Sequence, residues 1–292
     1  MASDDPLSRL LERLALEPEG PDVFGAPPVH GWRRLFGGLL AAQSALAAMR
    51  TVEGARLHSL HGYFLRPGRP GAALRFEVTR LRDGRRFATR RVLVRQLGEP
   101  VFELNCGFTG DEQGVAHAHE PPLPEPPPPP EELRDWETVR VEVGELPRPP
   151  DAIEARVCRP EDDRPGAPAP PHRLVWLRPR GRLPEDPALH AAVLVYASDR
   201  ALLRTAARLH GSLRERLPAS LDHAVWLHHP PRWDDWILYA CEAPIAHGGR
   251  AWVSGRMLDR AGVRLATVAQ EGLLRRPRPS GSGAPAREGP GA

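Results

Sequence analysis

Lysine is absent from the 292-residue sequence, and all 40 of its basic residues are arginine. The formal net charge is only +3, with 37 acidic residues spread along the chain, and this balance argues against a nucleic-acid-binding protein. Arginine suits phosphate recognition, because its planar guanidinium makes paired contacts with phosphate oxygens. We therefore expect any phosphate group that this protein recognises to be held by arginine.

Cysteine is scarce as well. Cys106, Cys158 and Cys241 lie far apart and form no Cys-x-x-Cys motif, which excludes a disulfide framework or a cysteine zinc site and fits a reducing compartment. No run of residues has the length and apolarity of a membrane span. The acidic start is unlike a secretory or transit peptide, and the peroxisomal Ser-Lys-Leu ending is absent. We therefore expect a cytoplasmic protein with no membrane span.

Several common catalytic signatures are also missing. The sequence contains no Gly-x-Ser-x-Gly, which argues against the nucleophile of an α/β-hydrolase. Three histidine pairs have no acidic residue at a known metal-ligand spacing, so we expect no metal site. These pairs are His58/His61, His117/His119 and His228/His229. Asp222 and His223 are neighbours in a predicted strand, so their side chains should point to opposite faces.

The chain does contain strand and helix patterns in both halves. Residues 38–49 are apolar on all sides except at Gln43 and Ser44, which predicts a buried helix, and Leu7–Leu16 predicts a peripheral one. Strands are predicted from alternation and β-branched runs. They are Leu74–Leu81 (with Leu74, Phe76 and Val78 inward), Arg91–Arg95, Val101–Phe108, Ile153–Val157, Leu174–Arg178, Leu221–His228, Trp236–Glu242, Arg250–Met257 and Val263–Leu274.

The stretch around Asp199 is expected to organise the second half. Val193–Tyr196 is a short apolar run of strand type, and Arg200–Leu209 has helical spacing. Ser198 and Asp199 are good N-cap residues for that helix. A helix N-terminus carries about half a positive charge and would stabilise an ionised Asp199. The arginine stripe at 200, 204 and 208 is expected to be a solvated face.

An internal repeat is predicted at a uniform offset of 161 residues. It relates Asp199 to Gly38, Ser220 to Ser59 and Gln270 to Thr109. We expect a terminal extension at 1–19, a first module at 20–110 and a second module at 172–276. The proline-rich residues 111–171 should connect them, and 277–292 should be a disordered tail.

Six stretches in the two halves resemble the type II acyl-CoA thioesterases of bacteria and peroxisomes, a double-hotdog family. In chain order they are Arg34–Gly38, His58–Gly68, Leu81–Gly84, Tyr196–Asp199, Ser220–His223 and Ala269–Arg275. The resemblance covers roughly residues 20–110 and 172–276. It implies an α+β fold of two tandem hotdog modules, each with a long central helix wrapped by an antiparallel sheet.

The resemblance also implies a water site. The family orients its attacking water with an Asp after Tyr-Ala-Ser, a Ser or Thr two residues before Asp-His, and a Gln before Glu-Gly. The matching positions are Asp199, Ser220 and Gln270, which are the predicted catalytic residues. Asp199 would accept a proton, while Ser220 and Gln270 would orient the water.

The predicted substrate-binding residues are Gly37, Gly38, Leu39, His58 and Arg66. The two glycines would let a substrate carbonyl approach backbone N–H groups at a helix start. Leu39 stands where the family usually has Gln, and Thr109 replaces another Gln that is common in the family.

We expect hydrolysis of fatty acyl-CoA without a cofactor, coenzyme A being part of the substrate, and we leave a homo-oligomer open. Two alternatives share the fold: a non-catalytic acyl-CoA-binding protein and an enoyl-thioester hydratase.

Overall fold

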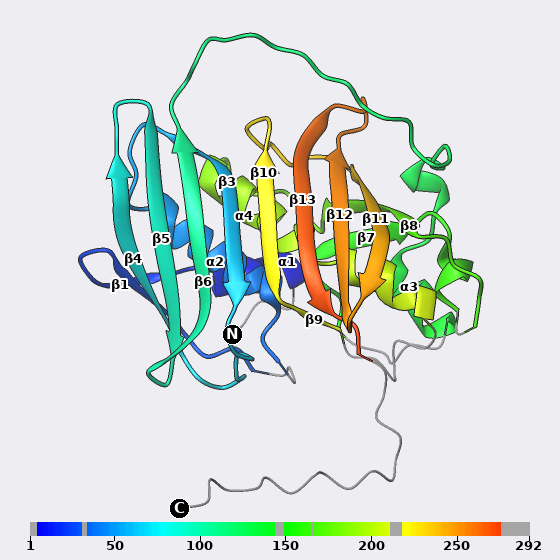
Figure 1. The fold of residues 1–292 in the computed structure, drawn as a ribbon, viewed down its shortest axis with the longest axis horizontal. Coiled ribbons are helices and arrows are strands. Elements are labelled where there is room, and N and C mark those ends of the chain that lie inside the picture. Colours follow the sequence, from blue (N-terminus) through cyan, green and yellow to red (C-terminus); the bar gives the residue numbers. More distant parts are fainter. Residues whose placement is uncertain (1–4, 31–33, 144–148, 165, 211–217, 276–292) are drawn as a thin grey trace, which may run out of the picture.

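The computed structural model describes residues 5–30, 34–143, 149–164, 166–210 and 218–275, in which a single antiparallel sheet backs a set of helices (Figure 1). The strands run in the order β1-β2-β4-β5-β6-β3-β10-β13-β12-β11-β8-β7, with the short β9 paired to β13. The strands are β1 (Glu17–Gly20), β2 (Val23–Ala26), β3 (Arg56–Phe64), β4 (Leu74–Asp83), β5 (Phe87–Gln96), β6 (Glu99–Thr109), β7 (Ile153–Val157), β8 (His172–Pro179), β9 (Ala219–Ser220), β10 (Asp222–Leu227), β11 (Ile237–His247), β12 (Arg250–Leu258) and β13 (Arg264–Leu273).

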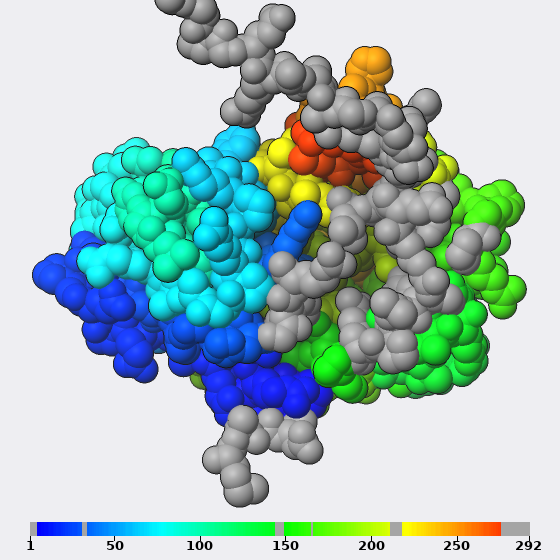
Figure 2. Space-filling model, turned by 90° about the horizontal axis from the view of Figure 1, so that it is seen from below, coloured from blue at the N-terminus to red at the C-terminus, as the bar shows by residue number. Residues whose placement is uncertain are grey.

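The strand order has an internal symmetry about the central β3–β10 pair. On one side β6, β5 and β4 follow β3, and on the other β13, β12 and β11 follow β10. The two halves of the sequence lie side by side, as Figure 2 shows from below. The strands predicted from alternation and β-branched runs are confirmed in both halves, with Leu74, Phe76 and Val78 inward, whereas the strand-type run at 193–196 is not. This is the arrangement that a double hotdog implies.

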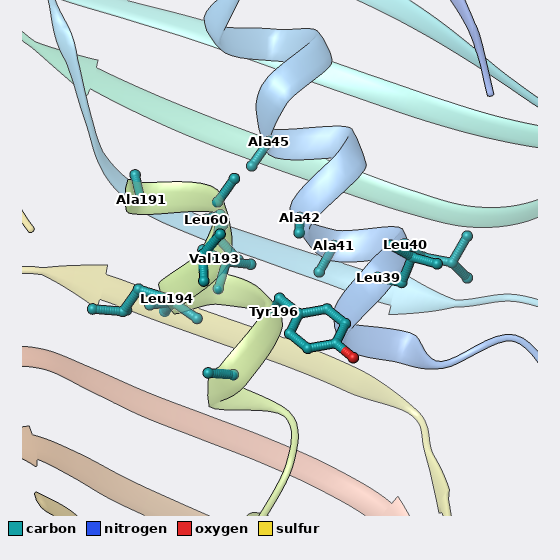
Figure 3. Packing of buried hydrophobic residues seen from close by; sticks show 14 of the residues in the cluster. Leu39, Leu40, Ala41, Ala42, Ala45, Leu60, Ala191, Val193, Leu194 and Tyr196 are labelled. Atoms are coloured by element: carbon teal, nitrogen blue, oxygen red, sulfur yellow. The ribbon is translucent and has the colours of Figure 1, made fainter. Parts of the chain in front are cut away.

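Two buried helices pack together on one face of the sheet. They are α2 (Gly37–Met49) and α4 (Pro187–Ser198). The other α-helices of the described residues are α1 (Pro6–Leu14), α3 (Trp136–Glu142) and α5 (Leu202–Ala207). Every residue of α2 from Gly38 to Ala48 is buried, as its all-round apolar pattern predicts. Figure 3 shows the small side chains of Ala41, Ala42 and Ala45 where α2 runs past α4. Small side chains allow this close approach of two helices.

The predicted strand at Val193–Tyr196 is wrong, because these residues belong to α4. The helix begins at Pro187, and the Asp186 side chain caps it by accepting from the Ala188 N–H. Asp199 is therefore the C-cap of α4 and not the N-cap of the following helix, α5, which begins only at Leu202. A fully buried helix has no polar face, so its apolar run reads like a buried strand.

The arginine stripe after Asp199 is not a solvated face, contrary to expectation. Arg200 forms an ion pair with Asp151, and its side chain is only 12% exposed. The buried Arg208 donates to the main-chain oxygens of Pro170 and His172. These guanidinium groups anchor the chain after α4 to the connection between the modules.

The uniform 161-residue repeat is also wrong in detail. The partner of α2 in the symmetry is α4, which begins 150 residues after it, and α5 has no counterpart among the described residues of the first half. In the sheet, Leu60 faces Cys106, so a uniform offset would make Leu221 face Thr267, yet Thr267 faces Trp226. The connections between corresponding elements differ in length in the two halves, so the offset between corresponding residues changes along the chain. The topological duplication remains.

The proline-rich connection passes over the top of the sheet in Figure 1 and then lies on the second half. Leu123 and Leu133 pack against the outer side of β8 and β11, and the Trp176 indole donates to Pro128 O at 2.9 Å. The predicted strand Ile153–Val157 is confirmed as β7, which pairs with β8 and extends the sheet. The module bounds themselves stay a prediction, and the tail at 277–292 lies outside the described residues.

Within the described ranges, no helix combines the length and the apolarity that crossing a membrane requires.

Candidate active site

Asp199, Ser220 and Gln270 meet in one hydrogen-bonded cluster. The Gln270 Nε2 group donates to Asp199 Oδ1 at 2.7 Å and to Ser220 Oγ at 3.0 Å. The Gly38 N–H donates to the other carboxylate oxygen, Oδ2, at 2.8 Å. A carboxylate, a hydroxyl and an amide of the second half thus meet the backbone of the first.

Three elements bring these groups together. Asp199 follows the last residue of α4, and Gln270 points inward near the end of β13, where it is 1% exposed. Ser220 lies in β9 opposite Gly272, close to the same end of β13. Both β9 and this end of β13 lie at the lower edge of the sheet in Figure 1.

The helix N-terminus beside Asp199 is that of α2. The start of α2 lies against the end of α4, since a Cβ on Gly38 would come within 2.5 Å of Tyr196 O. The positive end of the α2 dipole, carried by the Gly38 N–H, therefore faces the Asp199 carboxylate. A helix N-terminus does face Asp199, as predicted, but it is that of α2 in the first half and not that of the helix after Asp199.

Burial raises the pKa of Asp199 from its ordinary value to about 6. The Gln270 amide, the Gly38 N–H and the Ser220 hydroxyl act in the opposite direction, because they favour the ionised form, as does the Arg200 charge. The net result is a carboxylate that is mostly ionised at pH 7 and still basic enough to accept a proton. Those are the properties of a general base.

The two predicted glycines make room for this cluster. A Cβ on Gly37 would lie 2.8 Å from Asp199 Oδ2 and 2.8 Å from the tip of the Phe64 ring. The Gly38 N–H is committed to Asp199, so it is not free to bind a substrate carbonyl as predicted. The Leu39 and Leu40 N–H groups are bonded to Phe36 O, and in the described part of the chain the Gly37 N–H has no partner.

The other predicted substrate-binding residues lie at different places. Leu39 lines a small apolar hollow with Phe36 and Tyr196, next to the cluster. Arg66 follows β3 at the same end, where it donates to Pro100 O and pairs with Glu99 at 3.3 Å. His58 lies at the opposite end of β3 against Phe87, so the structure does not bring it to Asp199.

A supporting ion pair around Asp199 was not found from the sequence. Asp151 pairs with Arg200 and accepts from the Tyr196 hydroxyl at 3.2 Å. The neighbouring Arg200 charge keeps the pKa of Asp151 below its ordinary value despite burial. Because Tyr196 and Arg200 bracket Asp199, Asp151 fixes the chain on both sides of it. The contact joins residues far apart in sequence, and no local pattern signals it.

The site shows no metal-binding chemistry of its own. The described residues contain no group of three or more His, Cys, Asp or Glu side chains that could hold a metal ion.

Family models match both halves of the chain. Residues 26–109 match a model described as the acyl-CoA thioesterase N-terminal domain, and residues 151–273 match one described as acyl-CoA thioesterase. The second match begins at Asp151, so it includes β7 as well as Asp199, Ser220 and Gln270.

Full-length relatives agree with the family models. The chain is 37% identical to acyl-coenzyme A thioesterase 8 of Homo sapiens, over 90% of this chain and 87% of that one. It is 31% identical to acyl-CoA thioesterase 2 of Haemophilus influenzae, over 93% and 98% of the two chains.

Solved structures resemble the fold as well. The crystal structure of an acyl-CoA thioesterase II from Mycobacterium marinum is 36% identical with a TM-score of 0.77, and the match covers 92% of this chain and 99% of that one. A hot dog fold protein of unknown function from Alicyclobacillus acidocaldarius has a TM-score of 0.74 at 19% identity, over 92% and 98% of the chains, which shows the fold alone.

Proposed function

Because the chain belongs to the type II acyl-CoA thioesterase family, we propose that it hydrolyses fatty acyl-CoA to free fatty acid and coenzyme A. The observation that carries the proposal is the cluster in which a carboxylate with a pKa of about 6 meets Ser220 and Gln270. No cofactor enters the proposal. A cytoplasmic location and a role in fatty acid metabolism stay predictions, and a homo-oligomer is left open.

In the proposed reaction, water attacks the thioester carbonyl directly. The ionised Asp199 takes a proton from this water, while Ser220 and Gln270 hold it in line for attack. The N–H of Gly37 at the start of α2, which has no partner among the described residues, is the group that would stabilise the developing oxyanion. As the tetrahedral intermediate collapses, the carbon–sulfur bond breaks and the proton on Asp199 passes to the leaving thiolate. No acyl-enzyme forms.

Leu39 lies beside the cluster, but the hollow that it lines with Phe36 and Tyr196 has a volume of only about 10 Å³, close to that of one water molecule. The acyl group would therefore lie against Leu39 only after these side chains move apart. Leucine at position 39 adds apolar surface where the resembled family usually has an amide. The coenzyme A phosphates would be held by arginines, and Arg66 is a candidate because it follows β3 at the same end.

The direct test is release of free thiol from a panel of acyl-CoA substrates of increasing chain length. Thiol release at a rate that depends on enzyme concentration supports hydrolysis. A non-catalytic binding protein would bind acyl-CoA without releasing thiol. An enoyl-thioester hydratase would add water to an enoyl-CoA and leave the thioester intact. Absence of thiol release with every chain length would refute the proposal.

Activity should depend on pH through Asp199. The base works only when ionised, so kcat/KM should be constant at pH 7 to 8 and fall about tenfold per pH unit well below the pKa of about 6. Thiol release measured from pH 5 to 8 under first-order conditions gives this profile. A kcat/KM that stayed constant down to pH 5 would show that Asp199 is not the base.

Replacing Gly37 with alanine should lower turnover by about 10- to 100-fold, because the new methyl would press on Asp199 Oδ2 and Phe64 and displace the base. Gly110→Ala is a suitable control, since its Cβ would meet only ordinary contacts at 3.8 Å and beyond. Turnover and thermal unfolding should be measured on both variants. Wild-type turnover in a folded Gly37→Ala protein would show that a methyl group at position 37 does not displace Asp199.

A further inference from the structure

The residue before Asp199 is held from two sides by buried side chains. The Ser198 Oγ atom lies 2.8 Å from His223 Nε2, and the Tyr239 hydroxyl donates to Ser198 O at 2.7 Å. Ser198, His223 and Tyr239 are all completely buried. Gly255 makes room for Tyr239, because a Cβ there would come within 2.3 Å of the tyrosine ring. The end of α4 is therefore fixed just where Asp199 begins.

The hydrogen bonds of Ser198 determine which atom of His223 carries the proton. Ser198 Oγ also lies 2.8 Å from Val195 O, which can only accept, so the single hydroxyl proton is used there. The contact with the imidazole must then be donated by the Nε2–H of His223. Burial lowers the pKa of His223 to about 4, so the ring is neutral at pH 7 and has this one donor.

His223 and Gln270 are neighbours across two strands. The register that pairs Ala224 with Ala269 places His223 of β10 beside Gln270 of β13, and both side chains point inward. His223 holds Ser198, and Gln270 holds Asp199. Two adjacent strand residues thus bind two consecutive residues at the end of α4. Asp222, the other half of the Asp-His pair, points outward to His61 at 3.3 Å.

We propose that His223 is a positioning residue for the reaction, acting through Ser198 to aim the Asp199 carboxylate at Gln270 and the attacking water. The inference rests on the proposed function and adds a residue to it. His223 touches neither the carboxylate nor, in the proposed mechanism, the substrate. Its effect is geometric, and a displacement of about 1 Å at a catalytic group costs on the order of 100-fold in rate.

The test compares two substitutions at position 223. His223→Leu removes the donor at similar volume and should lower kcat by about 10- to 100-fold, with KM changed less than about twofold. His223→Gln supplies an amide N–H near the place of Nε2 and should restore most of the lost kcat. A loss of kcat that glutamine does not restore, or a change confined to KM, would overturn the proposal.

A matched control separates positioning from general destabilisation. His190 is a second buried histidine, and it lies in α4 toward the end that is far from Asp199. Its Nδ1 accepts a hydrogen bond from the Trp233 N–H at 2.9 Å. His190→Leu should lower the unfolding temperature about as much as His223→Leu and leave kcat unchanged. An equal kcat loss in both variants would show that His223 acts only on stability.

A double-mutant cycle tests whether the effect passes through Ser198. Ser198→Ala removes the acceptor of the His223 proton and should lower kcat by itself. Combining it with His223→Leu should add little further loss, because both changes break one hydrogen bond. Fully additive losses would mean that His223 acts by another route. Failure of the proposed function would appear separately, as a wild-type protein that releases no thiol.

Discussion

Replacing Asp199 with asparagine is expected to lower turnover by about 10²- to 10⁴-fold while the protein still folds, because the amide cannot accept a proton from water. The substitution keeps the size of the side chain and one of its two oxygens. The Gln270 amide can turn over so that its oxygen faces the new NH₂ group. The variant should therefore keep the cluster and lose only the base.

The sign of the pKa shift also predicts the stability of this variant. The folded protein holds the proton of Asp199 more tightly than the unfolded chain, so the stability due to this group is full below about pH 4 and is lost as pH rises through about 6. At pH 8 the ionised carboxylate is a cost that asparagine removes. The variant should then unfold at a temperature no lower than that of the wild type.

A matched control lies at the other end of α4. Asp186→Asn makes the same chemical change at the N-cap, where asparagine is an equally good cap, so stability and turnover should both be preserved. Thiol release and thermal unfolding should be measured on the wild type, Asp199→Asn and Asp186→Asn. Near-wild-type turnover in a folded Asp199→Asn protein would refute the mechanism.

The sequence predicted the strands well because their signal is local. Leu74, Phe76 and Val78 alternate with polar residues, and one buried face of a sheet requires that pattern. The helix α4 was missed because Val193 and Val195 favour strands and its neighbours are apolar on all sides. The Asp186-Pro187 start was a usable signal, since an N-cap followed by proline marks a helix beginning.

The site was predicted by resemblance to a family and not by spacing. Asp199, Ser220 and Gln270 meet as that resemblance implies, but the repeat placed Asp199 opposite Gly38 as an equivalent position. In the structure Gly38 is the hydrogen-bond donor to Asp199, because the start of one central helix lies against the end of the other. Such a contact depends on how two distant helices pack, and no local pattern determines it.

The buried charges were misread for a similar reason. Regular spacing of arginines on a short helix suggests a solvated face, yet Arg200 is only 12% exposed and pairs with Asp151. A buried charge is tolerated when an opposite charge and hydrogen bonds meet it. The partner, Asp151, lies in the connection between the modules, where the sequence suggested proline-rich chain and one strand at Ile153–Val157 but no ion pair.

The last expected result is that each chain has one working site, built mainly by the second half. The symmetry that relates α4 to α2 places Arg50, the C-cap of α2, where Asp199 stands as the C-cap of α4. Next to it the buried Arg90 donates to Thr51 O and Thr51 Oγ1. That end of the first half thus has guanidinium groups where the second half has its base, and a guanidinium cannot take a proton from water.

Titration with a tight, non-hydrolysable acyl-CoA analogue should therefore find one catalytic site per chain, seen as complete loss of thiol release at one equivalent. The double variant Asp199→Asn/Gln270→Leu should show no turnover above that of Asp199→Asn alone, because the first half has Arg50 at the position that corresponds to Asp199. A need for two equivalents, or turnover in the double variant near that of the wild type, would show that the first half is catalytic. Complete inhibition at one equivalent of the analogue, together with an inactive double variant, would mean that the two halves contribute different groups to a single site. The second half supplies the carboxylate, and the first supplies the helix start that holds it.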